Sequence, residues 1–204
     1  EVDVSMANAV QLYVGYIRDI CLKYNVNPMI EQRVVMLSVR NDVFGTSDCV
    51  VIIGEWLFVI DYKHGYDLVE VANNTQALHY AVSTLDTYQL WGTIKHVKTV
   101  IVQPNGGHKD GAIREHDYTI DQLVYWQQVF KEGVRKCEEE PVFQAGTHCK
   151  HCPAMANCRA RFYHTLDNGY LDKNLNHLTN DELAAIFKET KIIEKLVYVQ
   201  CHKG

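Results

Sequence analysis

Two acidic residues and one lysine flank a predicted β-hairpin. Residues 49–60 contain two apolar, β-branched runs separated by a Gly-Glu spacer, and a two-residue spacer of this kind is typical of a tight hairpin turn. Asp48 precedes the first run, and Asp61 ends the second, so antiparallel pairing places the two acids beside each other. Lys63 follows Asp61 by two residues and therefore leaves the same face of the strand.

Two neighbouring carboxylates favour a bound cation. They repel each other in a folded protein unless a positive charge lies between them, and Mg²⁺ binds through one or two carboxylates and several waters. Lys63 can orient an attacking water or offset charge that develops on a phosphate. The alternative is an edge hairpin with a surface salt bridge, and an Asp followed by Asp-x-Lys fits that interpretation equally well.

Composition limits the class of protein. The 204 residues are 47% apolar, which predicts either one globular domain or one domain plus a small appendage. We expect a nuclease-like core over residues 1–136 and a Cys-rich segment with C-terminal helices, packed on the core, over 137–204. The net charge of −5 argues against a broad surface for polyphosphates, so nucleic acid would bind at a local cleft. No apolar run is long enough to span a bilayer, and we predict no membrane association.

Helical and strand patterns alternate along the chain. We predict helices near residues 7–24, 74–91 and 119–137 and from residue 179, strands at 31–39 and 97–102 beside the hairpin, and an exposed loop at 108–116. A strand that follows a helix joins the sheet through a crossover, which predicts a mixed sheet. Gln76 and Tyr80 are four residues apart and share a helix face; the alternative is a surface glutamine and a core tyrosine.

Three of the seven cysteines form a compact set. Cys149, Cys152 and Cys158 lie within ten residues, and such thiols suit either Zn²⁺ or an iron–sulfur cluster in an intracellular protein. The fourth ligand is open: Cys137 and Cys21 are candidates, as is a residue upstream of this sequence. The alternative interpretation is a chance grouping of thiols.

In their order along the chain, these motifs resemble a nuclease family. The motifs are Gly45-Thr46-Ser47-Asp48, Asp61-Tyr62-Lys63, Gln76-x-x-x-Tyr80 and the late cysteine triple. Together they resemble the RecB-like branch of the PD-(D/E)XK nucleases over about residues 5–165. The similarity extends to the iron–sulfur subgroup that includes the AddB nuclease domain and the CRISPR-associated exonucleases, and within it to a phage-encoded family. It implies an α/β, restriction-endonuclease-like fold, with an antiparallel meander in a mixed sheet flanked by helices and a C-terminal Cys-rich helical segment.

The resemblance implies a role for each matching residue. Asp48 and Asp61 would bind Mg²⁺ or Mn²⁺ together with the backbone carbonyl of Tyr62, and Glu31 is a further candidate ligand. Lys63 would position the attacking water.

The remaining motifs line the site or lie elsewhere. Gln76 and Tyr80 would line the site and hold the DNA strand. Cys149, Cys152 and Cys158 would be the last three ligands of a structural 4Fe–4S cluster.

The chain opens on Glu1 without an initiator methionine, so we expect it to be a fragment or a processed product. We therefore expect its cluster to be incomplete, absent or replaced by zinc.

The function implied is a metal-dependent deoxyribonuclease, expected to be an exonuclease, in phage DNA processing or recombination. The implied partners are DNA and recombination or replication proteins, in the cytoplasm of a bacterial host, with an oligomer left open. The alternative is a catalytically inactive DNA-binding or protein-interaction module with the same fold and a zinc or iron–sulfur site. Fold alone does not distinguish these functions.

Overall fold

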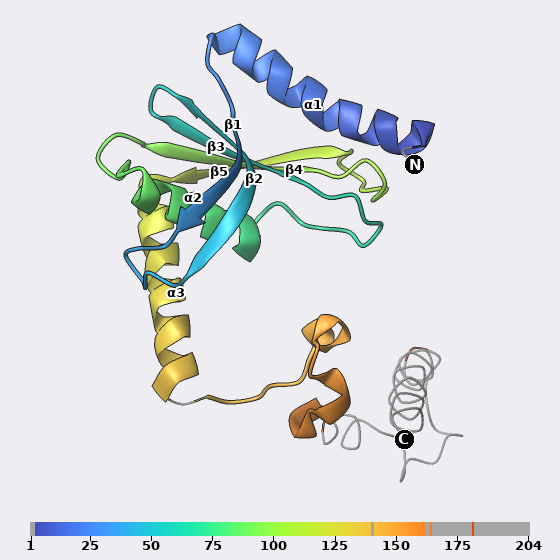
Figure 1. The fold of residues 1–204 in the computed structure, drawn as a ribbon, viewed down its shortest axis with the longest axis vertical. Coiled ribbons are helices and arrows are strands. Elements are labelled where there is room, and N and C mark those ends of the chain that lie inside the picture. The colour runs from blue at the N-terminus through green and yellow to red at the C-terminus, as the bar shows by residue number, and fades with distance from the viewer. Residues whose placement is uncertain (1–2, 140, 162–163, 165–180, 182–204) are drawn as a thin grey trace. The chain divides into compact units, whose positions relative to one another are not determined.

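The computed structural model describes residues 3–139, 141–161, 164 and 181 (Figure 1). Internal contacts divide the chain into two units, residues 1–139 and 140–204. The first unit contains α1 (Val4–Tyr24), β1 (Met29–Val35), β2 (Phe44–Ile53), β3 (Trp56–Tyr62), α2 (Thr75–Thr87), β4 (His96–Val102), β5 (Ile113–Thr119) and α3 (Ile120–Glu139).

The first unit is built on a five-stranded mixed sheet in the order β1-β2-β3-β4-β5. β1, β2 and β3 form an antiparallel meander, β4 pairs with β3 in parallel, and β5 pairs with β4 antiparallel. The parallel pair is joined through α2, as expected of a crossover connection. The predicted α/β class, with a meander in a mixed sheet flanked by helices, is confirmed.

The β2–β3 hairpin has the predicted two-residue turn, but both strands are longer than predicted, because β2 begins at Phe44 and β3 continues to Tyr62. Ile53 pairs with Trp56 and Cys49 pairs with Ile60, so the turn consists of the two residues between the strands. Gly54 has a φ of 56°, the left-handed conformation that glycine adopts at little cost and that a two-residue hairpin turn requires.

Helices cover both faces of the sheet. α1 lies on one face, and α2 lies on the other with α3 beyond it (Figure 1). The buried residues on the α1 side are Ile17, Cys49, Val51, Ile60, Val100 and Val102. Those on the α2 side include Val50, Leu57, Val59, Leu78, Ala81, Leu85, Val97 and Leu123. Successive residues of the inner strands therefore alternate between two apolar layers, which explains the nearly continuous apolar runs of β2, β3 and β4.

α2 ends one turn earlier than predicted. Asn74 begins it, since its Oδ1 accepts the Ala77 N–H at 3.0 Å. Gln89 has a φ of 56°, and the Leu90 N–H bonds to the Leu85 carbonyl at 2.8 Å, so the helical pattern stops before residue 91. A left-handed residue followed by such a bond is a common helix ending.

Two further predictions about strands were wrong. The first strand ends at Val35, because the Val39 and Arg40 N–H groups turn back to the Met36 carbonyl at 3.0 Å. The segment predicted as an exposed loop at 108–116 contributes the start of β5. The sequence did not predict β5, because this strand contains polar residues that pair with a neighbouring strand. Lys98 of β4 lies 2.6 Å from Asp117 of β5.

The second unit contains two short 3₁₀ helices in its described part, Thr147–His151 and Met155–Asn157. The helix predicted from residue 179 lies outside the described residues. Within the described part of the chain, we find no helix with the length and apolar character needed to cross a bilayer.

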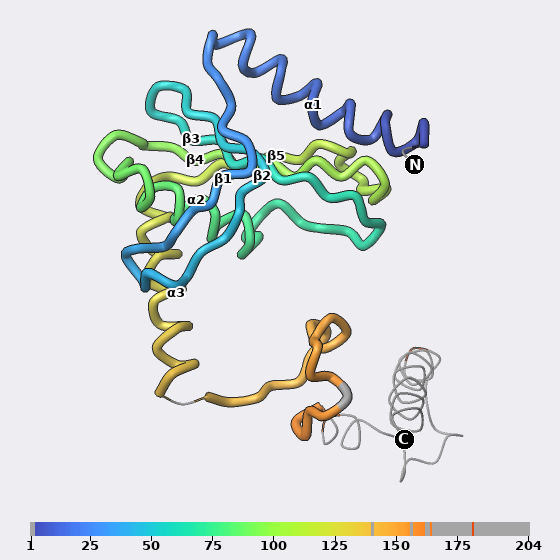
Figure 2. Tube along the Cα trace, in the orientation of Figure 1, coloured from blue at the N-terminus to red at the C-terminus, as the bar shows by residue number. Residues whose placement is uncertain are grey.

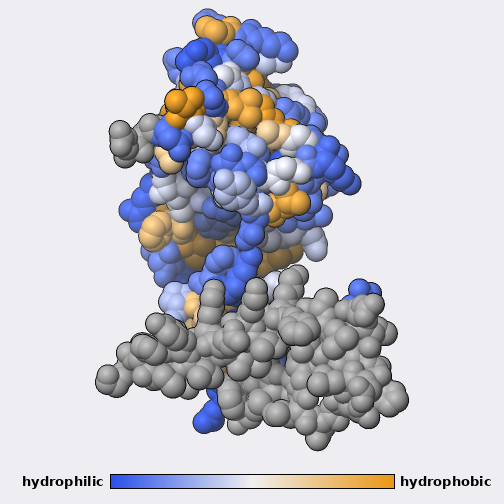
Figure 3. Space-filling view, turned by 90° about the vertical axis from the view of Figure 1, so that its right-hand side faces the viewer, coloured by the Kyte–Doolittle hydropathy of each residue, from blue (hydrophilic) through white to orange (hydrophobic). Residues whose placement is uncertain are grey.

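Figure 2 traces the path of the chain through the sheet. The coloured surface in Figure 3 is mainly hydrophilic and is interrupted by separate, small hydrophobic patches. Isolated apolar side chains of this kind are normal on a folded surface.

The central layer provides a stability test. Leu78 of α2 is fully buried, whereas Leu37 is exposed. We expect Leu78→Ala to lower the free energy of unfolding by about 2–5 kcal/mol, since it removes buried apolar surface and leaves a cavity. Leu37→Ala should change it by less than about 0.5 kcal/mol. Urea unfolding followed by tryptophan fluorescence measures the first unit, because all three tryptophans, Trp56, Trp91 and Trp126, lie in it. Equal effects of the two changes would contradict this core.

Candidate active site

The two acids lie beside each other where the pairing of β2 with β3 ends. The last paired residues are Cys49 and Ile60, and Asp48 and Asp61 are the next residue on each strand. The Asp48 carboxylate accepts the Tyr62 N–H, and its charge contributes to the raised pKa of Asp61. Val50 and Val59 belong to the layer that α2 covers, and alternation along each strand places both acids on that face.

Asp61 is a buried carboxylate with an incomplete set of partners. The residue is 2% exposed, and its Oδ2 lies 2.8 Å from Lys63 Nζ. Within the described residues that oxygen forms an ion pair but no hydrogen bond of good geometry. Burial raises the pKa of Asp61; Lys63 opposes this change and the nearby Asp48 adds to it. A cation bound to this oxygen would offset the cost of burying the Asp61 charge and would reduce its repulsion from Asp48.

Asp48 is held by the backbone beside Asp61. Its Oδ2 accepts the Tyr62 N–H at 2.8 Å, and the side chain is partly exposed. This hydrogen bond ties the β2 acid to the segment that contains Asp61 and Lys63. Tyr62, whose carbonyl was predicted as a metal ligand, is therefore in direct contact with one acid through its N–H.

A line of hydrogen bonds connects the acids to α2. Lys63 Nζ donates to Gln76 Oε1 at 2.7 Å, and Gln76 Nε2 donates to the Tyr80 hydroxyl at 3.0 Å. The structure thus brings together all five residues of the predicted site, including Asp48 and Asp61. The Tyr80 ring also packs on the core layer, so its part in the core and its place in the polar line are compatible.

Gly45 is required where Tyr80 meets β2. A Cβ atom built on Gly45 would lie 2.7 Å from Tyr80 Cε1 and 3.2 Å from His79 Cε1. Any larger residue would displace the ring from the strand. We had not predicted this role, although a glycine inside a strand often marks a close approach.

Tyr13 approaches the acids from the α1 side of the sheet. Its hydroxyl is buried and has no hydrogen-bond partner among the described residues, and its ring lies 5.5 Å from that of Tyr62. Burial raises its pKa strongly, with contributions from the negative charges of Asp48 and Asp61. No sequence signal indicated this contact, because α1 and the hairpin are far apart in the chain.

Glu31 is in line with the acid pair but is not joined to it. β1 pairs Ile30 with Cys49 and Gln32 with Ser47, so Glu31 lies at the level of Asp48. Its φ is 51° and its side chain is exposed. Across the described ranges, no three His, Cys, Asp or Glu side chains form a metal-binding group. The geometry places two carboxylates, rather than three, at the site.

The predicted cysteine ligands in the second unit also do not form a metal-binding group among the described residues. Cys149 is buried and accepts the Gly146 N–H at 3.4 Å, and Cys152 and Cys158 are partly exposed. The described residues do not gather these three thiols into a metal site, and the cluster stays a prediction from their spacing. The candidate fourth ligands, Cys21 and Cys137, lie on α1 and α3 of the first unit.

The raised pKa of Asp61 leads to a pH prediction. A carboxyl whose pKa is higher in the folded state binds its proton more tightly there. The free energy of unfolding therefore falls as the pH rises from the unfolded value, about 3.9, through the folded pKa. In EDTA, we expect Asp61→Asn to be more stable than the wild type at pH 7 and the difference to vanish near pH 4. Urea midpoints across this range measure it, and a difference that does not depend on pH would contradict the burial of a strained charge.

Two comparisons with known proteins show what this chain is similar to. A solved structure titled "Crystal structure of SSO0001" is similar with 15% sequence identity and a TM-score of 0.39, over 78% of this chain and 72% of that chain. The family model described as "Protein of unknown function (DUF2800)" matches residues 1–199. Because this match spans nearly the whole sequence, the chain belongs to the DUF2800 family.

Proposed function

We propose that this protein is a metal-dependent deoxyribonuclease of the RecB-like PD-(D/E)XK type. The proposal rests on the face of the sheet where Asp48 and Asp61 lie beside each other, just beyond the last β2–β3 pair, with Lys63 Nζ 2.8 Å from Asp61. A surface salt bridge does not require a second acid beside a buried one. Two carboxylates that share a face with one ammonium suit a divalent ion at a phosphodiester.

The residues present fit a hard divalent cation. Among the described residues, the buried Asp61 Oδ2 has only the Lys63 ammonium as a polar partner, and Asp48 supplies a second carboxylate from the neighbouring strand. Mg²⁺ and Mn²⁺ accept such oxygen ligands and need only one or two carboxylates. A bound ion would polarise the scissile phosphate and lower the pKa of a nearby water.

The other side chains orient the reactants. Lys63 holds its ammonium between Asp61 and Gln76, where it can position a water or offset charge on the phosphate. Gln76 fixes Lys63 and is itself fixed by Tyr80. Gln76 is the second residue of α2, so the helix N-terminus lies at the site, and its partial positive charge favours a phosphate.

The wider assignment follows the resemblance. We propose an exonuclease that processes or recombines phage DNA in a bacterial cytoplasm, with recombination or replication proteins as partners. Cys149, Cys152 and Cys158 are proposed as structural ligands of a 4Fe–4S cluster or zinc, completed by a further residue. The net charge of −5 fits DNA contacts that are confined to a local site.

A nuclease assay tests the proposal. Labelled single- and double-stranded DNA is incubated with the purified protein and Mg²⁺ or Mn²⁺. We expect cleavage that EDTA abolishes, and we expect Asp61→Asn and Lys63→Ala to reduce the rate by about 100-fold or more, because each removes a charge at the reacting phosphate. The matched controls are Asp121→Asn and Lys95→Ala, which change exposed residues outside the site and should retain the wild-type rate.

Two outcomes would contradict the nuclease. One is cleavage that survives Asp61→Asn, which would indicate a contaminating enzyme. The other is DNA binding by the wild type without cleavage in either metal, which would favour the inactive binding module.

A further inference from the structure

The connection between β3 and α2 is held along its length by a buried glutamine. Gln103, at the end of β4, is 1% exposed. Its Nε2 donates to the carbonyls of Gly65 at 2.9 Å and Asp67 at 2.8 Å. Its Oε1 accepts the Val69 N–H at 3.2 Å. One amide side chain thus binds the backbone of three alternate residues of the connection, Gly65, Asp67 and Val69.

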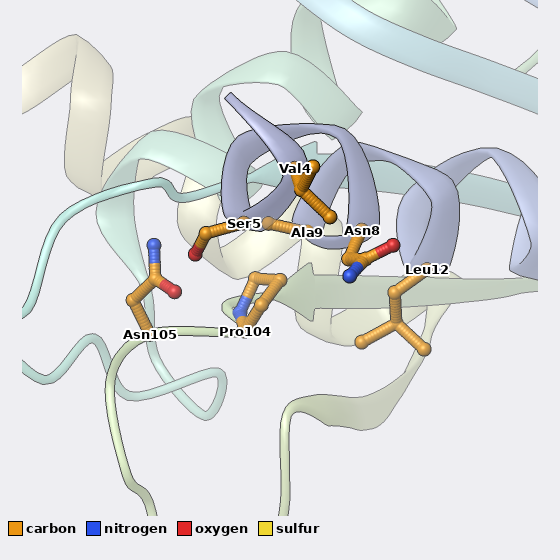
Figure 4. A pocket seen from close by; sticks show the side chains of 7 residues that line it. All are labelled: Val4, Ser5, Asn8, Ala9, Leu12, Pro104 and Asn105. Atoms are coloured by element: carbon orange, nitrogen blue, oxygen red, sulfur yellow. The ribbon is translucent and has the colours of Figure 1, made fainter. Parts of the chain in front are cut away.

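The neighbouring loop adds further contacts. The buried Arg114 donates to Gln103 Oε1 and to the Val69 carbonyl, both at 2.9 Å. Asn105 Nδ2 donates to the His64 carbonyl at 2.9 Å. Figure 4 shows Asn105 with Pro104 on this loop, facing the first turns of α1. The connection is therefore anchored to β4, β5 and the loop between them.

A second pair of contacts fixes the far end of the connection. His108 Nδ1 accepts the Asp110 N–H at 3.1 Å, which leaves Nε2 to donate to Glu70 Oε1 at 3.2 Å. Gly106 packs against Gln103, since a Cβ atom there would lie 2.6 Å from Gln103 Cδ. The β3–α2 connection and the β4–β5 loop extend from the same end of the sheet in Figure 2.

This anchoring presents two apolar side chains to solvent. Tyr66 is 80% exposed, and Leu68 is also exposed. They alternate with Gly65, Asp67 and Val69, whose backbones are bound. An aromatic ring on an immobilised backbone loses little conformational entropy when a flat ligand stacks on it.

Tyr66 is also close to the candidate site. It follows Lys63 by three residues, so their Cα atoms are at most about 11 Å apart. The Lys63–Gln76 hydrogen bond of 2.7 Å closes the connection at its base, so both ends of the segment lie at the site. At a rise of about 3.4 Å per nucleotide, about three nucleotides span that Cα–Cα distance.

We propose that Tyr66 is a stacking platform for an unpaired base of the DNA strand at this site, which makes single-stranded DNA the substrate class. The inference rests on the proposed nuclease function. Stacking suits every base, because each has a π-face, and it does not require the basic surface that a chain with a net charge of −5 lacks. In a blunt duplex the internal bases are stacked on each other, so Tyr66 has no free base face to bind there.

Binding in EDTA tests the platform without cleavage. Fluorescence anisotropy measures the affinity of the full chain for a labelled oligothymidine and for a blunt duplex of two separate strands, which has no loop. We expect Tyr66→Ala to weaken single-strand binding by about 5- to 100-fold, the effect of losing one base–aromatic contact, and to leave duplex binding unchanged. Tyr66→Phe keeps the ring and should bind as the wild type does. Tyr125→Ala is the matched control, because Tyr125 is a 65% exposed tyrosine on α3.

The outcomes separate this inference from the nuclease itself. Wild-type binding that Tyr66→Ala leaves unchanged, an equal loss for duplex, or an equal loss in Tyr66→Phe would overturn the platform. Wild-type protein that binds no single strand would also overturn it. If the wild type binds single strands through Tyr66 but cleaves no DNA when Mn²⁺ is added, the proposed nuclease function fails and the stacking platform stands.

Discussion

The structure depends on a buried carboxylate that is only partly compensated. Asp61 lies inside the sheet with one ammonium, that of Lys63, at 2.8 Å, and a second acid, Asp48, lies beside it. Burying a charge costs several kcal/mol unless its partners repay the lost hydration. One lysine, shared with a glutamine, offsets this cost only in part, so burial and the neighbouring Asp48 raise the pKa of Asp61. Such an imbalance is common at functional sites, where a ligand completes the set of charges.

Much of the fold serves to hold this arrangement in place. The two-residue turn at Gly54 sets the register that aligns the acids, and apolar layers on both faces of the sheet prevent the strands from slipping. α2 places Gln76 against Lys63. Gly45 lets the Tyr80 ring approach β2. Each of these contacts restricts the motion of one polar atom at the site.

The features predicted from sequence were those encoded locally. The hairpin followed from two apolar runs and a spacer, and the crossover followed from a helix between strands. β5 was missed because its polar residues are compensated by Lys98 on another strand, which no local pattern reveals. The Gln103 contacts were missed because their partners are backbone carbonyls, which every residue possesses. For Gln76 and Tyr80, the spacing of four predicted a shared face, but only the folded chain connects that face to Lys63.

Mn²⁺ titration by calorimetry measures whether Asp48 and Asp61 hold a divalent ion together. We expect the wild type to bind Mn²⁺ and Asp48→Asn and Asp61→Asn each to abolish or greatly weaken this binding, whereas Asp121→Asn should not. Binding that persists unchanged in both site variants would contradict a shared metal site at these two carboxylates.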